Sequence, residues 1–289
     1  MAHLYSMTGF GKATLQLAAK KITIEVKSLN SKQLDMNIRT PLFYREKEAD
    51  IRHIVSNKVV RGKVDLSFYC EVTGAEKAPK INEALASEYI RQLKGLSEKY
   101  SIQGDVLSAV MRMPDVMQPA EDEVDEEEWA AITKVIDEAV DRLNKFRTDE
   151  GETLKVDLIE RLGIIRNRLE QVTPFEEDRV KRLREKLSRG LAEIADKPDE
   201  NRYEQEIIYY LEKLDVTEEK VRLKSHLDYF EQLLNEGGAN GKKLGFVSQE
   251  MGREINTLGS KANHAGMQKL VVEMKDELEK IKEQVLNIL

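Results

Sequence analysis

The sequence predicts an α+β protein in which a small N-terminal antiparallel-type β-sheet with helices precedes a long all-α C-terminal part. Apolar and polar residues alternate between residues 15 and 38, which is the period of half-buried strands. From Trp129 onward, apolar residues recur three and four positions apart, and this spacing places them on one face of a helix. Charged residues make up 34% of the 289 residues, a share typical of long solvated helices.

Three strands are expected in the alternating region. Hairpin connections are predicted at residues 18–21 and at Asn30-Ser31, and Pro41 ends the third strand. A helix over about 43–60 follows, and the next residues turn the chain into a fourth strand over about 64–72. The order β-β-β-α-β predicts an antiparallel sheet backed by a helix. The alternating apolar residues are Leu15, Leu17, Ile22, Ile24, Val26, Leu34, Met36 and Ile38.

Helices are predicted for the rest of the chain. The acidic run at residues 121–128 is interpreted as a solvated loop that leads into a negatively charged first helical turn, with a metal or partner site as the alternative. The helix that follows is expected to continue to about Leu169 despite Gly151 and Gly163, until Thr173-Pro174 breaks it. Other helices are predicted over about 82–100, 104–113, 175–194, 204–214, 216–236, 242–258 and 264–289, with a further break at Pro198.

Two domains are predicted, residues 1–150 and residues 151–289, although one helix is expected to run through the boundary. The net charge of −7 and the pI near 5.4 argue against an obligate nucleic-acid binder, unless the basic residues are gathered on one surface. Cys70 is the only cysteine, so an internal disulfide is excluded and a reducing cytoplasm is expected. We expect neither a membrane span nor a signal peptide.

The sequence lacks the common motifs for phosphate loops, dinucleotides, zinc proteases and paired cysteines. Its first informative stretch surrounds the helix predicted over 216–236. Beside the apolar stripe of this helix, Asp215, Glu219, Arg222 and His226 share one flank. Carboxylates and imidazole can bind a divalent ion, arginine can bind a phosphate, and histidine can transfer a proton near neutral pH. The structural alternative is a helix cap at Asp215, a Glu219–Arg222 ion pair and a half-buried histidine.

The second stretch is the helix predicted over 242–258. Glu250 and Glu254 lie four residues apart on one face, with Arg253 beside both, and could share a metal ion. Ordinary surface charge is the alternative. Polar residues Asn256, Ser260 and Lys261 follow at the end of this helix, and Lys242 and Lys243 lie at its start.

A basic run forms the third feature. Six cations follow Asp178 with few acids among them, so they could bind a phosphate backbone, or they could form a solvated helix face. They are Arg179, Lys181, Arg182, Arg184, Lys186 and Arg189.

Several of these stretches together resemble the YicC/YloC family. The resemblance is carried by residues 6–11, 25–30 and 61–64, by the Arg-x-x-Glu-Gly element at 147–151, and by residues 202–226 and 249–262. It covers essentially the whole chain. The sequence departs from the family pattern at Gly245, where Asp is usual, and at Gly252, where Asn is usual.

The resemblance implies a cytoplasmic endoribonuclease that cuts single-stranded RNA with the help of a divalent cation, Mn²⁺ or Mg²⁺. It also implies a ring-like homohexamer. On this basis the expected metal ligands are Asp215, Glu219, Glu250, Glu254 and His226. The expected catalytic residues are His226, Glu219, Glu250, Glu254, Arg222 and Arg253, and the expected RNA-binding residues are Lys242, Lys243, Lys261, Asn256, Arg179 and Arg182.

The expected mechanism is hydrolysis of a phosphodiester bond. A carboxylate-bound cation would activate water, His226 would act as general acid or base, and Arg222 and Arg253 would stabilise the charge on the phosphate oxygens. Two alternatives stay open: a non-catalytic RNA-binding adaptor, and an oligomeric scaffold whose polar clusters are ion pairs between subunits.

Overall fold

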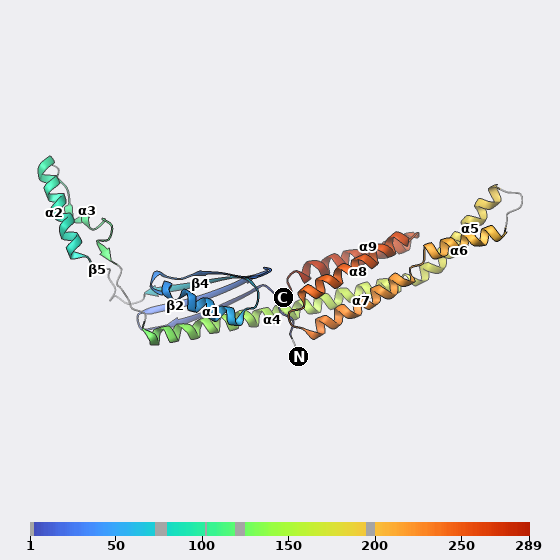
Figure 1. The fold of residues 1–289 in the computed structure, drawn as a ribbon, viewed down its shortest axis with the longest axis horizontal. Helices are drawn as coiled ribbons and strands as arrows, with labels where there is room; N and C mark the ends of the chain where they lie inside the picture. Colours follow the sequence, from blue (N-terminus) through green and yellow to red (C-terminus); the bar gives the residue numbers. More distant parts are fainter. Residues whose placement is uncertain (1–2, 73–79, 102, 119–124, 195–199) are drawn as a thin grey trace.

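The computed structural model describes residues 3–72, 80–101, 103–118, 125–194 and 200–289. The predicted α+β class is confirmed: a four-stranded sheet with helices comes first, and a long helical part follows (Figure 1). In the described part of the chain, no helix is long and apolar enough to span a membrane.

The sheet is mixed rather than antiparallel throughout. Its strands are β1 (Gly9–Gln16), β2 (Lys20–Leu29), β3 (Leu34–Arg39) and β4 (Gly62–Val72). They lie in the order β1-β2-β4-β3, and β3 runs parallel to β4 while the other pairs are antiparallel.

The hairpin predicted at Asn30-Ser31 is therefore wrong, because β2 pairs with β4 and not with β3. Between β3 and β4 the chain forms a 3₁₀ helix, η1 (Leu42–Lys47), and then α1 (Glu48–Lys58). A parallel strand pair needs a crossover connection of this kind. The single helix predicted over 43–60 is thus two consecutive helices, and together they carry the chain from one strand to its parallel neighbour.

One face of the sheet packs against α4 (Glu126–Glu170) and α1, which buries the alternating apolar residues of β2 and β4. Gly11 of β1 touches α4 so closely that an added Cβ would lie 1.9 Å from the carbonyl oxygen of Ala139. Asp125 caps α4 by accepting a hydrogen bond from the backbone of Glu127. Residues 125–128 therefore confirm the negatively charged first turn, and residues 121–124 of the acidic run lie outside the described residues.

Between β4 and α4 the chain forms a separate small unit. It consists of β5 (Lys80–Ile81), α2 (Glu83–Tyr100), α3 (Val106–Val110) and β6 (Met117–Gln118). Both helices were predicted, whereas two-residue strands leave no periodicity to detect. The unit has its own core, built on Ala86, Val110 and Val116, and it extends away from the sheet (Figure 1).

The helical part continues from α4. Its other helices are α5 (Thr173–Ile194), α6 (Glu200–Lys213), α7 (Thr217–Glu236), α8 (Gly241–Lys261) and α9 (Ala265–Val285). Helices α4, α7, α8 and α9 form a bundle around one apolar core, and α5 and α6 lie side by side beyond its end (Figure 1). The break predicted at Thr173-Pro174 is confirmed, and Pro198 lies outside the described residues.

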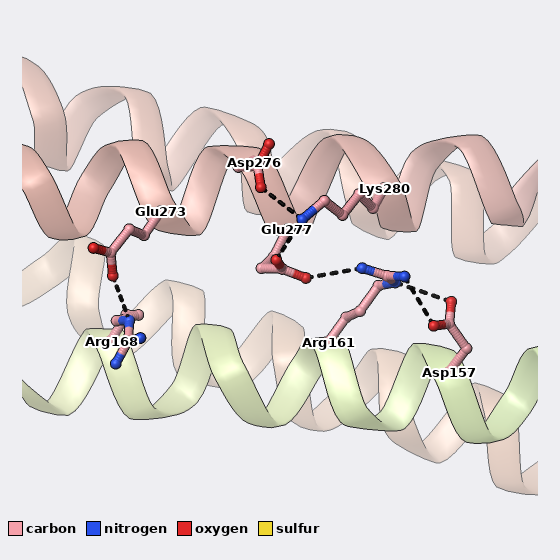
Figure 2. A network of polar contacts seen from close by, with 7 residues as sticks. All are labelled: Asp157, Arg161, Arg168, Glu273, Asp276, Glu277 and Lys280. Carbon is pink, nitrogen blue, oxygen red and sulfur yellow. Dashed lines mark hydrogen bonds and ion pairs between the residues drawn. The ribbon is translucent and has the colours of Figure 1, made fainter.

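Ion pairs join α4 to α9 along the bundle, as Figure 2 shows. Arg161 of α4 binds Asp157 at 2.9 Å and Glu277 of α9 at 3.0 Å. About two turns farther along α4, Arg168 binds Glu273 of α9 at 2.6 Å. Apolar packing and these paired charges fix α9 on the second half of α4.

The first described residues tie the two halves together at the middle of α4. Leu4 forms a bridge with Gly238, and Ser6 forms one with Ile288 near the other end of the chain. Buried Arg147 of α4 donates hydrogen bonds to the carbonyl oxygens of Met7 and Arg61. As expected, α4 runs without interruption through residue 150, so the proposed domain boundary stays a prediction.

Candidate functional site

An ion pair between a buried carboxylate and a partly exposed lysine lies where the end of α8 meets the start of α7. Lys261 Nζ lies 2.7 Å from Glu219 Oε1, and Glu219 is 5% exposed. The other oxygen, Glu219 Oε2, is buried without a hydrogen-bond partner among the described residues. At their other ends the two helices are joined by a tight turn through Gly237 and Gly238, whose positive φ angles favour glycine. Because this turn makes α8 antiparallel to α7, the end of α8 lies beside the start of α7.

Two further charged groups border this pair. Asp215 accepts hydrogen bonds from the Thr217 hydroxyl at 2.7 Å and from the Thr217 backbone at 3.0 Å. These bonds lower the pKa of Asp215, and the nearby Lys261 ammonium lowers it further. Arg179 of α5 is buried and donates to the Lys261 carbonyl oxygen at 3.2 Å, and its burial lowers its pKa. We call Arg179, Asp215, Glu219 and Lys261 the bundle-end cluster.

A groove of about 750 Å³ opens between α5 and α6 beside this cluster. Four of its described lining residues are cations and none is acidic: Arg179, Arg182, Lys186 and Lys213. The remaining lining residues are Leu183, Leu187, Gly190, Tyr210, Leu214 and Asn263. Arg182 also binds Asp178 at 2.8 Å, while Lys186 and Lys213 form no ion pair with another described residue. The groove therefore has the charge expected of an anion-binding surface.

His264 closes the turn between α8 and α9 next to the groove. Its Nδ1 accepts from the Gly266 backbone at 3.0 Å, so its Nε2 carries the proton and donates to Asp178 at 3.1 Å. The ring packs against Phe175 with 5.0 Å between centroids. His264 is thus a structural link between α9 and α5, and it was not among the predicted site residues.

The sequence matches two family profiles that together cover nearly the whole chain. Residues 4–156 match "Endoribonuclease YicC-like, N-terminal region", and residues 172–289 match "Endoribonuclease YicC-like, C-terminal". The chain belongs to the YicC-like family.

Two curated relatives agree with this membership. The protein named "Probable endoribonuclease YicC" from Clostridioides difficile (strain 630) is 37% identical over 289 residues, which cover 98% of this chain and 99% of the relative. The protein of the same name from Haemophilus influenzae (strain ATCC 51907 / DSM 11121 / KW20 / Rd) is 30% identical over 287 residues, covering 99% of each chain.

The fold of this YicC-like chain gathers five of the predicted residues. Arg179, Arg182, Asp215, Glu219 and Lys261 come from three separate stretches of sequence and meet at the bundle end or in its groove. Lys213 and Tyr210 of the groove were not predicted, because their only signal was their place on an amphipathic helix.

The other predicted residues lie farther along α7 and α8. Lys242 and Lys243 are exposed at the opposite end of α8, about 28 Å from Lys261 at 1.5 Å per residue. Arg253 pairs with Glu250 at 2.9 Å, and Glu254 and His226 are half-buried at about the same level of the two antiparallel helices. Asn256 is exposed one turn before the end of α8.

The Glu219–Arg222 ion pair considered as an alternative is wrong. Arg222 pairs with Glu218 on the exposed side of α7, while Glu219 turns inward to Lys261. This difference arises because Glu219 continues the buried stripe of Leu223 and Leu227, and Arg222 does not.

The carboxylates that were predicted to bind a metal form two separate pairs. Asp215 and Glu219 lie at the bundle end, whereas Glu250 and Glu254 lie about 10–16 Å back along α8 from Lys261. Among the residues that the structure describes, no three His, Cys, Asp or Glu side chains gather as a metal-binding group. Within the described part of one copy, the four carboxylates therefore do not come together around one point.

The two glycines that depart from the family pattern face the bundle interior. An added Cβ would lie 3.8 Å from Val285 at Gly245 and 3.4 Å from Leu278 at Gly252, with Lys282 Nζ next to the latter at 3.5 Å. Both neighbours belong to α9, so an Asp or Asn here would meet α9. These departures take no group away from the bundle-end cluster.

Proposed function

We propose that this chain is an endoribonuclease that cleaves phosphodiester bonds of single-stranded RNA, with a divalent cation such as Mn²⁺ or Mg²⁺ and in the form of a cytoplasmic homohexamer. The main support is the groove between α5 and α6, whose described lining has four cations and no acid in a chain of net charge −7. Membership of the YicC-like family and the name of the two relatives support the same activity.

In this proposal the groove holds the RNA backbone and the bundle-end cluster lies next to a bound phosphate. Arg182, Lys186 and Lys213 supply positive charge along the strand. Lys261 is partly exposed and can turn toward a phosphate oxygen as negative charge builds on it, leaving Glu219 as a nearby proton acceptor. The divalent cation would supply charge neutralisation at the phosphate, and Asp215 and Glu219 are the carboxylates of the bundle-end cluster that could contribute to holding it.

His226, Glu250, Glu254, Arg222 and Arg253 are proposed as a second group of residues on the α7 and α8 flank. His226 lies seven residues beyond Glu219, which is about 10 Å along the helix. The two groups therefore make separable predictions.

The test is cleavage of an end-labelled single-stranded RNA by purified protein, with Mn²⁺, with Mg²⁺ and with EDTA. Glu219→Gln and Lys261→Met probe the bundle-end cluster, and His226→Ala and Glu250→Ala probe the flank. Loss of at least about 100-fold in rate in the first pair alone would place the chemistry at the bundle end. Loss in the second pair alone would place it on the flank.

Two results would count against the proposal. Cleavage that persists undiminished in EDTA would contradict the need for a divalent cation. RNA binding without cleavage under every condition would support a non-catalytic adaptor, in which the groove holds RNA for another nuclease.

Light scattering of the same preparation would show whether the particle has the mass of six chains.

A further inference from the structure

The groove between α5 and α6 contains an aromatic side chain as well as cations. Tyr210 of α6 is half-buried and lines the groove together with Lys186 and Lys213. The neighbouring Tyr209 ring packs edge-on against it, with 5.6 Å between centroids and 75° between planes. This contact supports the Tyr210 ring from one side, while the groove leaves room on another.

The volume of the groove suits a nucleotide. Sites for small ligands usually have volumes of about 300–1,000 Å³, and the groove has about 750 Å³. Leu183, Leu187 and Leu214 add an apolar surface to the lining. A flat base that packs on this surface is removed from water, which favours binding.

The charge of the groove indicates which occupant it prefers. The whole chain has 53 acidic and 46 basic residues, yet no acidic residue is among the described residues of this lining. A second copy of the chain would also bring an excess of negative charge. Its only flat rings, however, would be aromatic side chains, which make up 6% of the residues. A single-stranded nucleic acid, with one flat base and one negatively charged phosphate in each nucleotide, matches both the cations and the ring.

We propose that the groove is a nucleotide-binding subsite in which Tyr210 stacks on an unpaired base while Lys186, Lys213 and Arg182 bind the adjoining phosphates. This inference rests on the proposed function, since it takes RNA as the ligand. It makes Tyr210 the residue that selects single-stranded RNA. Bases in a duplex are already stacked on their neighbours, so they cannot present a face to the ring without first being unpaired.

The experiment measures binding separately from cleavage. Fluorescence anisotropy in EDTA would give the affinity for a labelled oligoadenylate and for an RNA duplex of the same length. Tyr210→Ala is expected to weaken binding of the oligoadenylate about 5- to 100-fold, the range found for loss of one base–aromatic stack, and to leave duplex binding unchanged. Tyr210→Phe keeps the ring and is expected to bind within about twofold of the wild type.

Lys186→Ala tests the phosphate contact. It is expected to weaken the binding of both RNAs and to reduce the slope of log affinity against log salt by about 0.7 for the single strand. Two matched controls are available. Tyr229→Ala removes an exposed tyrosine of α7, and Lys275→Ala removes an exposed lysine of α9. Neither residue lines the groove.

Several outcomes would overturn the inference. If Tyr210→Ala binds both RNAs like the wild type, or weakens both equally, Tyr210 is not a stacking platform. If Tyr210→Ala or Tyr210→Phe changes the mass of the particle in light scattering, the groove is a contact between copies. If the wild type cleaves RNA and Tyr210→Ala still prefers the single strand over the duplex as the wild type does, this inference alone is overturned. If RNA binding depends on Tyr210 but no cleavage occurs, the proposed function alone is overturned. If the wild type binds no RNA, both are overturned.

Discussion

Two glycines of α4, Gly151 and Gly163, differ in how much space lies beside their Cα atoms. An added Cβ at Gly151 would lie 2.0 Å from the carbonyl oxygen of Leu4, whereas nothing lies within 4 Å of the same position at Gly163. Gly151 therefore lets the backbone of Leu4 and Tyr5 lie directly on α4. Gly163 has no such neighbour, so it only weakens the helix.

The two positions make opposite predictions for stability. Gly151→Ala should destabilise the protein by about 1–3 kcal/mol, because the backbone of Leu4 must move. Gly163→Ala should stabilise it by up to about 1 kcal/mol, because alanine is the better helix former. Thermal unfolding of the two variants measures both effects, and equal changes in the same direction would contradict this account.

Tyr44 predicts how the sheet end of the protein responds to alkali. Burial raises the pKa of Tyr44 strongly, and its hydrogen bond to Glu128 raises it further. A raised pKa in the folded state means that this stabilisation is complete below the pKa of an unfolded tyrosine, about 10, and is lost as the pH rises above it.

The free energy of unfolding should therefore fall more steeply above about pH 10 in the wild type than in Tyr44→Phe. Glu128 also accepts a hydrogen bond from Lys20 at 2.9 Å, and the Tyr44→Phe substitution does not remove either group of this bond. Urea titrations across this range would measure the effect, with Tyr69→Phe, which changes an exposed tyrosine of β4, as the control. Parallel curves for the wild type and Tyr44→Phe would disprove the role of burial.

At the scale of helices, the ion pairs in Figure 2 differ in what they hold together. Glu277 of α9 binds Arg161 of α4 and also Lys280 on its own helix, and its side chain is 13% exposed. Asp276 binds only Lys280 among the described residues, within α9, and is 66% exposed. The first carboxylate therefore links two helices and the second does not.

Glu277→Gln should cost about 1–2 kcal/mol of stability, because it weakens a charged hydrogen bond that is largely shielded from water. Asp276→Asn should cost less than about 0.5 kcal/mol, because exposed pairs within one helix are weak. Chemical unfolding of the two variants gives the comparison. A larger loss in Asp276→Asn would mean that the network stabilises α9 itself and not its contact with α4.

Local patterns were sufficient to predict most elements but not their partners. Alternation identified the strands of the sheet, and spacing of three and four identified α4 to α9. Pairing of β3 with β4 depends on η1 and α1 folding back between them, and nothing in the strand residues themselves encodes this choice.

The candidate site was predictable only in part for the same reason. Glu219 and Lys261 were both singled out, but their contact joins residues 42 positions apart, and Arg179 reaches them from a third helix. Tyr210 carries no sequence signal that separates it from an ordinary apolar position on α6. Its role depends on the groove, which exists only once α5 and α6 lie side by side.

At the scale of the whole molecule, the two halves share α4 and are joined by the first and last described residues. Separate unfolding of one half would leave a long apolar stripe of α4 exposed, so one cooperative transition is expected. The only tryptophan, Trp129, packs on the sheet core and reports on that half.

Tryptophan fluorescence and the far-ultraviolet circular dichroism of the helices should therefore give the same midpoint in urea. Most of the helical signal comes from the other half, so the two probes are independent. Midpoints that differ clearly would show that the halves unfold one after the other despite their common helix.

The continuity of α4 also limits how such chains can be recombined. A chimera that exchanges halves between two relatives at residue 150 would cut the helix where Gly151 meets Leu4 and next to Arg147. Leu4 and Ser6 from one parent would then contact Gly151 and Ile288 from the other parent. A crossover before Asp125 would keep α4 with the bundle of the same parent, but the apolar face of the sheet would then have to fit the α4 of the other parent. Sequence exchange in this architecture is thus expected to succeed only when α4, the sheet face that packs on it and the segment around Leu4 come from the same parent.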